Sequence, residues 1–260
     1  MFYTVNTPLL VSLPNNPGSS ENKGFYYYMK VGGFLKTAIL IDGGFYRRRS
    51  QTLFGSKSPG ERTDELFQYC TKHITEKHEN RELYRVFYYD CRPMAKKVYH
   101  PLLKKTIDFE KSELYKWSND FLSELRKKRK FALRLGKLGE TQAHYNLKPD
   151  ITKKLCNNRI SLSELTENDF TIKVEQKGVD MRIGLDISSM AYKKQVEQVI
   201  LISGDSDFVP AAKLARREGI DFILDPMGSN IKTDLEEHID GIRSMYKYFV
   251  TVPVGDSNFK

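Results

Sequence analysis

Short runs of apolar residues alternate with segments of helical spacing along most of this chain. The apolar runs are rich in β-branched and aromatic side chains and predict strands at residues 37–45, 83–90, 199–202 and 219–224. Apolar positions at helical spacing predict helices at residues 61–77, 107–130, 180–191, 211–217 and 233–239. Strands that alternate with helices in this way are typical of an α/β fold with a parallel sheet.

Two further segments alternate apolar and polar residues, as half-exposed strands do. They cover residues 131–138 and 170–177, and we expect them to pair with each other. The polar stretch between them, residues 139–169, has no clear periodicity and is predicted to be a partly mobile insertion able to cover a binding site. Residues 246–252 are predicted to form an edge strand.

The first 28 residues differ in composition from the rest of the chain. Pro8, Pro14, Pro17 and Gly18 stand here among Asn and Ser residues, a combination that favours turns and linkers. We therefore expect residues 1–28 to be a flexible tail that need not belong to the native protein, and residues 29–260 to form the folded domain.

The overall composition indicates a soluble globular protein, with 40% hydrophobic and 29% charged residues. No apolar run approaches the ~20 residues that cross a bilayer, and the N-terminus lacks the Lys/Arg-led apolar segment of a signal peptide. The three cysteines, Cys70, Cys91 and Cys156, are scattered. This spacing predicts neither a disulfide framework nor a zinc site and favours a reducing, cytoplasmic environment.

The formal net charge of +9 favours polyanionic partners such as RNA, DNA or an anionic membrane face, although it is also compatible with solubility alone. Two dense basic runs contribute to it, at residues 47–49 and 126–130. Either run can contact phosphates. Alternatively, the first is a solvated surface run, and the second neutralises the dipole at a helix end.

Aspartates follow the ends of two predicted strands. Asp42 ends the first strand, while Asp205 and Asp207 come after the strand at residues 199–202. Right-handed crossovers bring the carboxyl ends of parallel strands to one edge of the sheet, where ligands bind. Carboxylates gathered there repel one another unless a proton or a cation relieves the repulsion. Mg²⁺ and Mn²⁺ prefer such oxygen ligands.

Two more aspartates lie on the predicted helix at residues 180–191. Asp180 continues the apolar stripe of this helix and Asp186 lies at its edge, where we expect a carboxylate to be paired, protonated or metal-bound. Each candidate also has an ordinary interpretation: Asp42 in an Asp-Gly turn, Asp180 as an N-cap, and Asp186 as an exposed helix carboxylate. Asp90, at the end of the second strand, is expected to be a turn carboxylate; the alternative is that it lines the same crevice.

Three segments of the chain resemble the acidic motifs of the NYN domain. They are Ala38-Ile39-Leu40-Ile41-Asp42-Gly43, Lys177-Gly178-Val179-Asp180 with Asp186, and Ile200-Leu201-Ile202-Ser203-Gly204-Asp205-Ser206-Asp207-Phe208. The resemblance extends over about residues 36–243 and is strongest to the LabA-like group. It implies a PIN-like fold, which is a Rossmann-like parallel sheet with helices on both faces, and metal-dependent cleavage of RNA.

The resemblance also implies roles for individual residues. By motif position, catalytic and metal-coordinating roles fall to Asp42, Asp180, Asp205 and Asp207, and a metal-coordinating role falls to Asp186. Many members of the family have an asparagine shortly after the first aspartate, where this chain has Phe45-Tyr46.

Two hypotheses of function follow. The first is a Mg²⁺- or Mn²⁺-dependent ribonuclease that cleaves single-stranded RNA endonucleolytically, in which Ser203 or Ser206 orients a phosphate oxygen. Its RNA-binding residues are Arg47, Arg48, Arg49, Arg126, Lys127, Lys128, Arg129 and Lys130. The second is a non-catalytic RNA- or protein-binding module on the same fold. A phosphatase or nucleotide-handling enzyme is less favoured because no Gly-rich phosphate loop is present. We expect no membrane partner, and homo-oligomerisation stays open.

Overall fold

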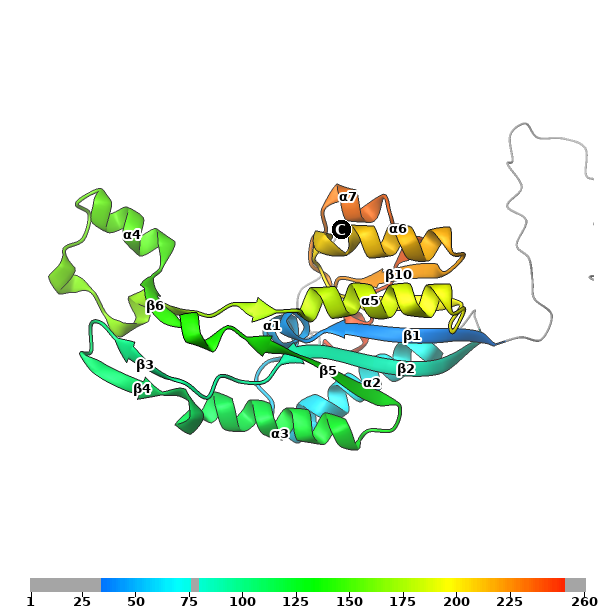
Figure 1. Ribbon diagram of the computed structural model, residues 1–260, viewed down its shortest axis with the longest axis horizontal. Coiled ribbons are helices and arrows are strands. Elements are labelled where there is room, and N and C mark those ends of the chain that lie inside the picture. Colours follow the sequence, from blue (N-terminus) through cyan, green and yellow to red (C-terminus); the bar gives the residue numbers. More distant parts are fainter. Residues whose placement is uncertain (1–33, 76–79, 251–260) are drawn as a thin grey trace, which may run out of the picture. The chain divides into compact units, whose positions relative to one another are not determined.

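The fold is known from a computed structural model that describes residues 34–75 and 80–250 (Figure 1). The predicted tail, residues 1–28, lies outside the described residues, as does residue 29, where the folded domain was expected to start.

A seven-stranded sheet with the order β11-β10-β9-β1-β2-β5-β8 forms the centre of the fold. All neighbouring strands in it are parallel except β5 and β8, which are antiparallel. Its strands are β1 (Leu35–Asp42), β2 (Arg81–Cys91), β5 (Phe131–Leu138), β8 (Gln176–Lys177), β9 (Gln198–Ile202), β10 (Asp221–Asp225) and β11 (Gly241–Ile242). The predicted α/β class with a parallel sheet is confirmed.

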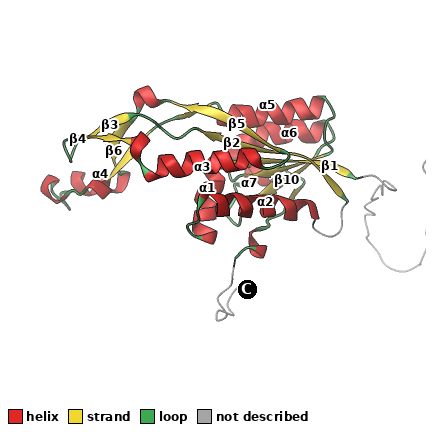
Figure 2. Cartoon of the chain, turned by 90° about the horizontal axis from the view of Figure 1, so that it is seen from below, coloured by secondary structure: helices red, strands yellow, loops and turns green. Residues whose placement is uncertain are grey.

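Helices cover both faces of this sheet, as Figures 1 and 2 show. One face carries α5 (Val179–Tyr192) and α6 (Val209–Arg217), and the other carries α1 (Gly43–Phe54), α2 (Pro59–Thr75) and α3 (Glu113–Lys127). The strand β1 serves both layers because successive side chains of a strand point to opposite faces. Ala38 and Leu40 pack in the core under α5 and α6, whereas Ile39 and Ile41 pack under α2 and α3.

The remaining elements are short. Two small antiparallel sheets pair β3 (Lys97–His100) with β4 (Lys105–Asp108), and β6 (His144–Leu147) with β7 (Phe170–Lys173). They are accompanied by α4 (Pro149–Cys156), α7 (Thr233–Glu236) and 3-10 turns at Phe109–Lys111, Glu140–Gln142, Leu162–Glu164, Glu167–Asp169, Ser206–Phe208 and Tyr246–Tyr248. The stretch expected to be an insertion, residues 139–169, contains β6 and α4, which lie beyond the carboxyl end of the sheet in Figure 1.

The order of the strands reverses at β1. The chain runs from β1 outward to β2 and β5, and then returns to the other side of β1 with β9 and β10. Neighbouring connections therefore leave β1 and β9 in opposite directions, which opens a crevice at their carboxyl ends. Asp42 and the segment that follows Ile202 stand at this place.

Several predicted elements differ from the structure. The first strand ends at Asp42, the aspartate predicted to end it, but residues 43–54 form α1, which was not predicted. Only residues 113–127 of the predicted helix at 107–130 are α-helical; Ile107 lies on β4, where it pairs with Val98. Residues 246–252 were expected to be a strand, but Tyr246–Tyr248 is a 3-10 turn and the edge is taken by β11; residues 251–252 lie outside the described part.

The predicted pairing of residues 131–138 with 170–177 is confirmed only at its end. Lys137 pairs with Lys177 and Leu138 with Gln176, whereas the rest of β5 pairs with β2 in parallel. Residues 170–173 instead pair with β6. Local alternation indicates that a segment is half-exposed, but it does not determine which strand becomes its neighbour.

A buried hydrogen-bonded cluster joins the end of β10 to α2 and to the C-terminal segment. The carboxylate of Asp225 is fully buried and accepts from the Tyr69 hydroxyl (2.6 Å) and the Ser244 hydroxyl (2.7 Å). His73 Nε2 lies 2.8 Å from the same carboxylate, and the Met227 amide donates to it at 2.7 Å. A buried carboxylate with this many partners is costly to disturb.

We expect Asp225→Ala to lower the free energy of unfolding by about 3 kcal/mol or more, because it leaves buried donors without an acceptor. Chemical denaturation measures this loss. Asp234→Ala is the control, since its side chain is 66% exposed, and it should change the free energy by less than about 0.5 kcal/mol. Equal losses of stability in Asp225→Ala and Asp234→Ala would contradict a stabilising role for the buried Asp225 cluster.

The same cluster predicts how stability depends on pH. Burial acts to raise the pKa of Asp225, but the hydrogen bond and charge of His73, with Tyr69 and Ser244, outweigh it and hold the pKa below its ordinary value. A carboxyl whose pKa is lowered by folding stabilises the fold above its unfolded pKa of about 3.9, and this contribution is lost as the pH falls through the folded value. We expect the free energy of unfolding to fall more steeply with decreasing pH in the wild type than in Asp225→Asn. Denaturant unfolding at a series of pH values between neutral and acidic measures this difference.

Candidate functional site

Asp42 lies where β1 ends and α1 begins. Its backbone is extended, and its carboxylate accepts from the Phe45 amide (3.0 Å), so that it caps the new helix. The other carboxylate oxygen accepts from the Ser203 hydroxyl at 3.4 Å. Ser203 follows β9 directly and is fully buried. This contact links the ends of the two central strands at the crevice.

Asp205 and Asp207 lie in the turn between β9 and α6. The Asp205 amide donates to the Ser203 hydroxyl (3.2 Å), and the Asp207 amide donates to Asp205 Oδ1 (3.0 Å), so Asp205 caps the 3-10 turn. Both aspartates are exposed. The Ser203 hydroxyl thus donates to the Asp42 carboxylate and accepts from the Asp205 amide. These two hydrogen bonds fix the end of β1 relative to the turn that follows β9.

Asp180 comes from the first turn of α5. The N-cap of this helix is Gly178, at φ +78°, and no side chain caps it. Asp180 is therefore not the N-cap, and that ordinary interpretation of the residue is wrong. Its carboxylate lies within electrostatic range of Asp42, Asp205 and Asp207.

The electrostatics of this edge are unfavourable for its carboxylates. The pKa of Asp180 is raised, first by burial and then by the negative charges of Asp42, Asp205 and Asp207. Burial also raises the pKa of Asp42, against the lowering effects of the Phe45 amide and of Arg48. Among the described residues, none of the four carboxylates forms an ion pair with Lys, Arg or His.

These four side chains offer only carboxylate oxygens, and Mg²⁺ and Mn²⁺ favour such donors. The donor chemistry and the uncompensated negative charge therefore fit a divalent cation. In residues 34–75 and 80–250, however, no three His, Cys, Asp or Glu side chains are grouped tightly enough to hold a metal ion. The four aspartates share an edge and an electrostatic field, but they do not form a closed coordination shell.

Asp186 has different surroundings. It accepts from Arg134 Nε at 3.0 Å and from the Tyr89 hydroxyl at 2.8 Å. Its charge is thus balanced by an arginine, unlike that of the four aspartates above. A metal-coordinating role for Asp186 stays a prediction from the motif.

The three arginines after Asp42 lie on α1 and have different contacts. Arg47 forms a two-pronged ion pair with buried Asp90, at 3.0 and 3.1 Å. Arg49 donates to the Met227 carbonyl at 2.7 Å. Arg48 is exposed, and its charge acts on Asp42. Of the three, Arg48 is the one whose guanidinium is open to solvent beside the acidic cluster.

The second basic run lies on the amino side of the sheet, beside the middle of β2. The residues Arg126, Lys127, Lys128, Arg129 and Lys130 span the end of α3 and the turn that leads into β5. Phe131, the first residue of β5, pairs with Val86 in the middle of β2, so the run that precedes it lies on the amino side of this level of the sheet, away from Asp42. Three of the lysines already contact Glu124, Asp64 and the Leu83 carbonyl. The structure does not bring this run to the acidic cluster.

Some features of this edge were not found from the sequence. Gly204 packs against Phe45, and a Cβ atom at Gly204 would lie 2.8 Å from the Phe45 ring. Tyr46 is fully buried, and its hydroxyl donates to Glu65 at 3.1 Å. Lys232 donates to the Ser206 hydroxyl at 3.1 Å and brings a cation to the turn that carries Asp205 and Asp207. No local sequence pattern indicates these long-range contacts.

A comparison with protein-family models matches residues 106–239 to the NYN domain. The match includes β9, the aspartates that follow it, and Asp180. The chain belongs to the NYN domain family. The matched region does not include β1, yet the fold places Asp42 of β1 beside the matched aspartates of this NYN domain.

Other comparisons add little about this NYN domain. No curated protein sequence matches it. One similar solved structure is a protein of unknown function from Vibrio parahaemolyticus, which has 17% sequence identity and a TM-score of 0.45 over 84% of this chain and 96% of that chain. At this similarity it does not bear on function. Within the described part of the NYN protein, no helix is long and apolar enough to cross a membrane.

The repulsion at this edge predicts a gain of stability when one charge is removed. We expect Asp180→Asn to raise the free energy of unfolding of the metal-free protein by about 0.5 kcal/mol, as for exposed interacting charges. Added Mn²⁺ should then stabilise the wild type more than the variant. Thermal unfolding in EDTA and in Mn²⁺ measures both effects. A variant less stable than the wild type in EDTA contradicts the repulsion.

Proposed function

We propose that this NYN domain protein is a metal-dependent ribonuclease that hydrolyses phosphodiester bonds within RNA. The observation that supports the proposal is the set of four aspartates at the crevice between β1 and β9, which have no cationic partner among the described residues. Family membership also supports it, because NYN domains are usually nucleases of a PIN-like fold. We further propose that the chain belongs to the LabA-like group, on its three acidic motifs.

In this proposal, Asp42, Asp180, Asp205 and Asp207 hold Mg²⁺ or Mn²⁺. The bound ion supplies charge stabilisation and an activated water for phosphodiester hydrolysis. Ser203 fixes Asp42 and Asp205 relative to each other through its hydroxyl. Ser206, which accepts from Lys232, orients a phosphate oxygen at the same turn. Arg48 contacts an adjoining phosphate from the first turns of α1.

The proposed substrate is single-stranded RNA, and the proposed location is the cytoplasm. Single strands suit the arrangement because their backbone can bend into a crevice at a sheet edge. The cytoplasm suits the cysteines: all three are free, and Cys70 and Cys91 are buried.

The decisive substitution is Asp205→Asn, which keeps the size of the side chain and removes its charge. We expect it to reduce Mn²⁺-dependent cleavage of single-stranded RNA roughly 10²- to 10³-fold, because a bound metal supplies several kcal/mol to the transition state. The matched control is Asp150→Asn on α4, an exposed aspartate away from the crevice, which should cleave like the wild type. Cleavage of a circular RNA establishes that the cut is internal.

Unchanged cleavage by Asp205→Asn shows that this carboxylate is not part of the site. Calorimetric titration with Mn²⁺ extends the test, because binding that is lost in Asp205→Asn assigns the ion to the crevice. RNA binding by the wild type, without cleavage and without a need for metal, would instead support a non-catalytic binding module on the same fold.

A further inference from the structure

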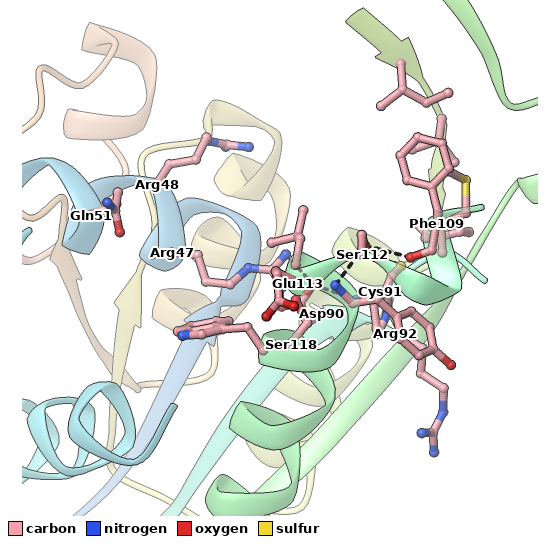
Figure 3. A pocket seen from close by; sticks show the side chains of 18 of the residues that line it. Arg47, Arg48, Gln51, Asp90, Cys91, Arg92, Phe109, Ser112, Glu113 and Ser118 are labelled. Atoms are coloured by element: carbon pink, nitrogen blue, oxygen red, sulfur yellow. Dashed lines mark hydrogen bonds and ion pairs between the residues drawn. The ribbon is translucent and has the colours of Figure 1, made fainter. Parts of the chain in front are cut away.

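A cavity of about 800 Å³ lies beside the acidic cluster. This volume is within the range of ligand pockets, ~300–1,000 Å³. Its walls come from the first turns of α1, the end of β2, α3, and the segments around β7 and β8 (Figure 3). The cavity does not include any of the four aspartates, so the proposed function does not account for it.

Much of the lining is apolar, and most of these side chains are partly exposed while they pack against the buried core. Leu114 is 70% exposed, although it is a large apolar side chain on α3. Phe109, Trp117 and Ile172 also line the cavity and are only partly buried. Trp117 is held in place by its indole N–H, which donates to the Lys57 carbonyl at 2.9 Å, and by stacking on Phe121. Rigid aromatic and aliphatic surfaces of this kind suit a planar base.

The charges of the lining favour an anion at one side. Arg47 is paired with Asp90, while Lys57 and Arg62 are paired with Glu65. In the part of the chain that the structure describes, Arg48 and Arg92 have no carboxylate within ion-pair distance. Glu113 carries the opposing charge and lies in the first turn of α3, where the helix dipole stabilises it.

Residues of α1 lie between the cavity and Asp42. Arg47, Arg48 and Asp90 line the cavity, and all three act electrostatically on Asp42 or are acted on by it. Gln176 also lines the cavity, and both its side-chain oxygen and Asp42 Oδ1 lie within 4 Å of the point where a Cβ atom of Gly44 would stand. A chain whose phosphate lies at Asp42 can therefore pass Arg48 and enter the cavity.

We propose that this cavity binds one nucleotide of the single-stranded RNA that flanks the bond to be cleaved. The base lies among Leu114, Phe109 and Trp117, and the adjoining phosphates contact Arg48 and Arg92. The proposal rests on the proposed ribonuclease function for the direction in which the RNA enters. It adds a specificity site that selects a flexible, unpaired nucleotide, because a base within a duplex cannot leave its stack without a large cost.

The chain provides its own reporter, because Trp117 is its single tryptophan. The probe is a fluorescently labelled oligouridylate of about twelve nucleotides, a length within the usual range of single-strand binding sites. Titrating it in EDTA excludes cleavage, and following both probe anisotropy and Trp117 emission separates binding in general from binding in the cavity. We expect a saturable change of Trp117 emission that follows the anisotropy.

Two substitutions test the two halves of the cavity, each with a matched control. Leu114→Glu should weaken binding about tenfold, as expected for loss of one stacked base, and Arg92→Gln should weaken it less and reduce its salt dependence. Leu162→Glu, at a residue that is 73% exposed, and Arg217→Gln, at the exposed end of α6, should bind like the wild type. Both cavity residues are exposed, so the variants are expected to fold.

Three results overturn the proposal. The first is RNA binding that leaves Trp117 emission unchanged, or that Leu114→Glu does not weaken. The second is absence of RNA binding in EDTA. The third is an equal response to uridine monophosphate at the same concentration, which would indicate a site for free nucleotides. The cleavage assay tests the proposed ribonuclease function separately. Cleavage that depends on Asp205 but is unchanged in Leu114→Glu rejects the nucleotide site in the cavity and retains the ribonuclease. RNA binding in the cavity without any cleavage rejects the ribonuclease and retains the nucleotide site.

Discussion

Mutual repulsion among four carboxylates is the constraint that the rest of this structure accommodates. Asp42, Asp180, Asp205 and Asp207 reach one edge of the sheet from three different segments. Packing elsewhere holds them there: the core on both faces of β1 fixes the strand, and Ser203 joins its end to the turn after β9. The fold tolerates this unfavourable arrangement because large buried cores on both sides of the sheet offset it.

Aspartates end three of the parallel strands, and the fold gives each a different role. Asp42, at the switch point between β1 and β9, has no ion pair with any residue that the structure describes. Asp90, one strand away, is buried and balanced by Arg47. Asp225 is buried at the end of β10 and is satisfied by Tyr69, His73 and Ser244. Of these three strand-end carboxylates, the one without an ion pair among the described residues is the one at the switch point, where ligands bind in open α/β sheets.

The helix α1 links the chemistry of the site to its surroundings. Its N-terminus is capped by Asp42, and Gly43 at its start allows close packing, since a Cβ atom there would lie 2.6 Å from Tyr88 and from the Tyr89 carbonyl. One turn later, Arg47 and Arg48 reach the cavity proposed to bind RNA. A displacement of α1 would therefore alter both the position of Asp42 and the shape of the cavity.

The sequence by itself determined the fold class, the two central strands, and the aspartates that stand where strands end, because apolar runs and turn residues are local signals. It predicted the buried stripe of α5, including Ile183 and Ile187, for the same reason. Only the tertiary structure decided which charges meet. Arg47 and Asp90 are 43 residues apart, the basic run after α3 lies on the amino side of the sheet, away from Asp42, and the ordinary N-cap role of Asp180 gave way to Gly178. These outcomes depend on strand order and on long-range packing, which no local pattern of residues encodes.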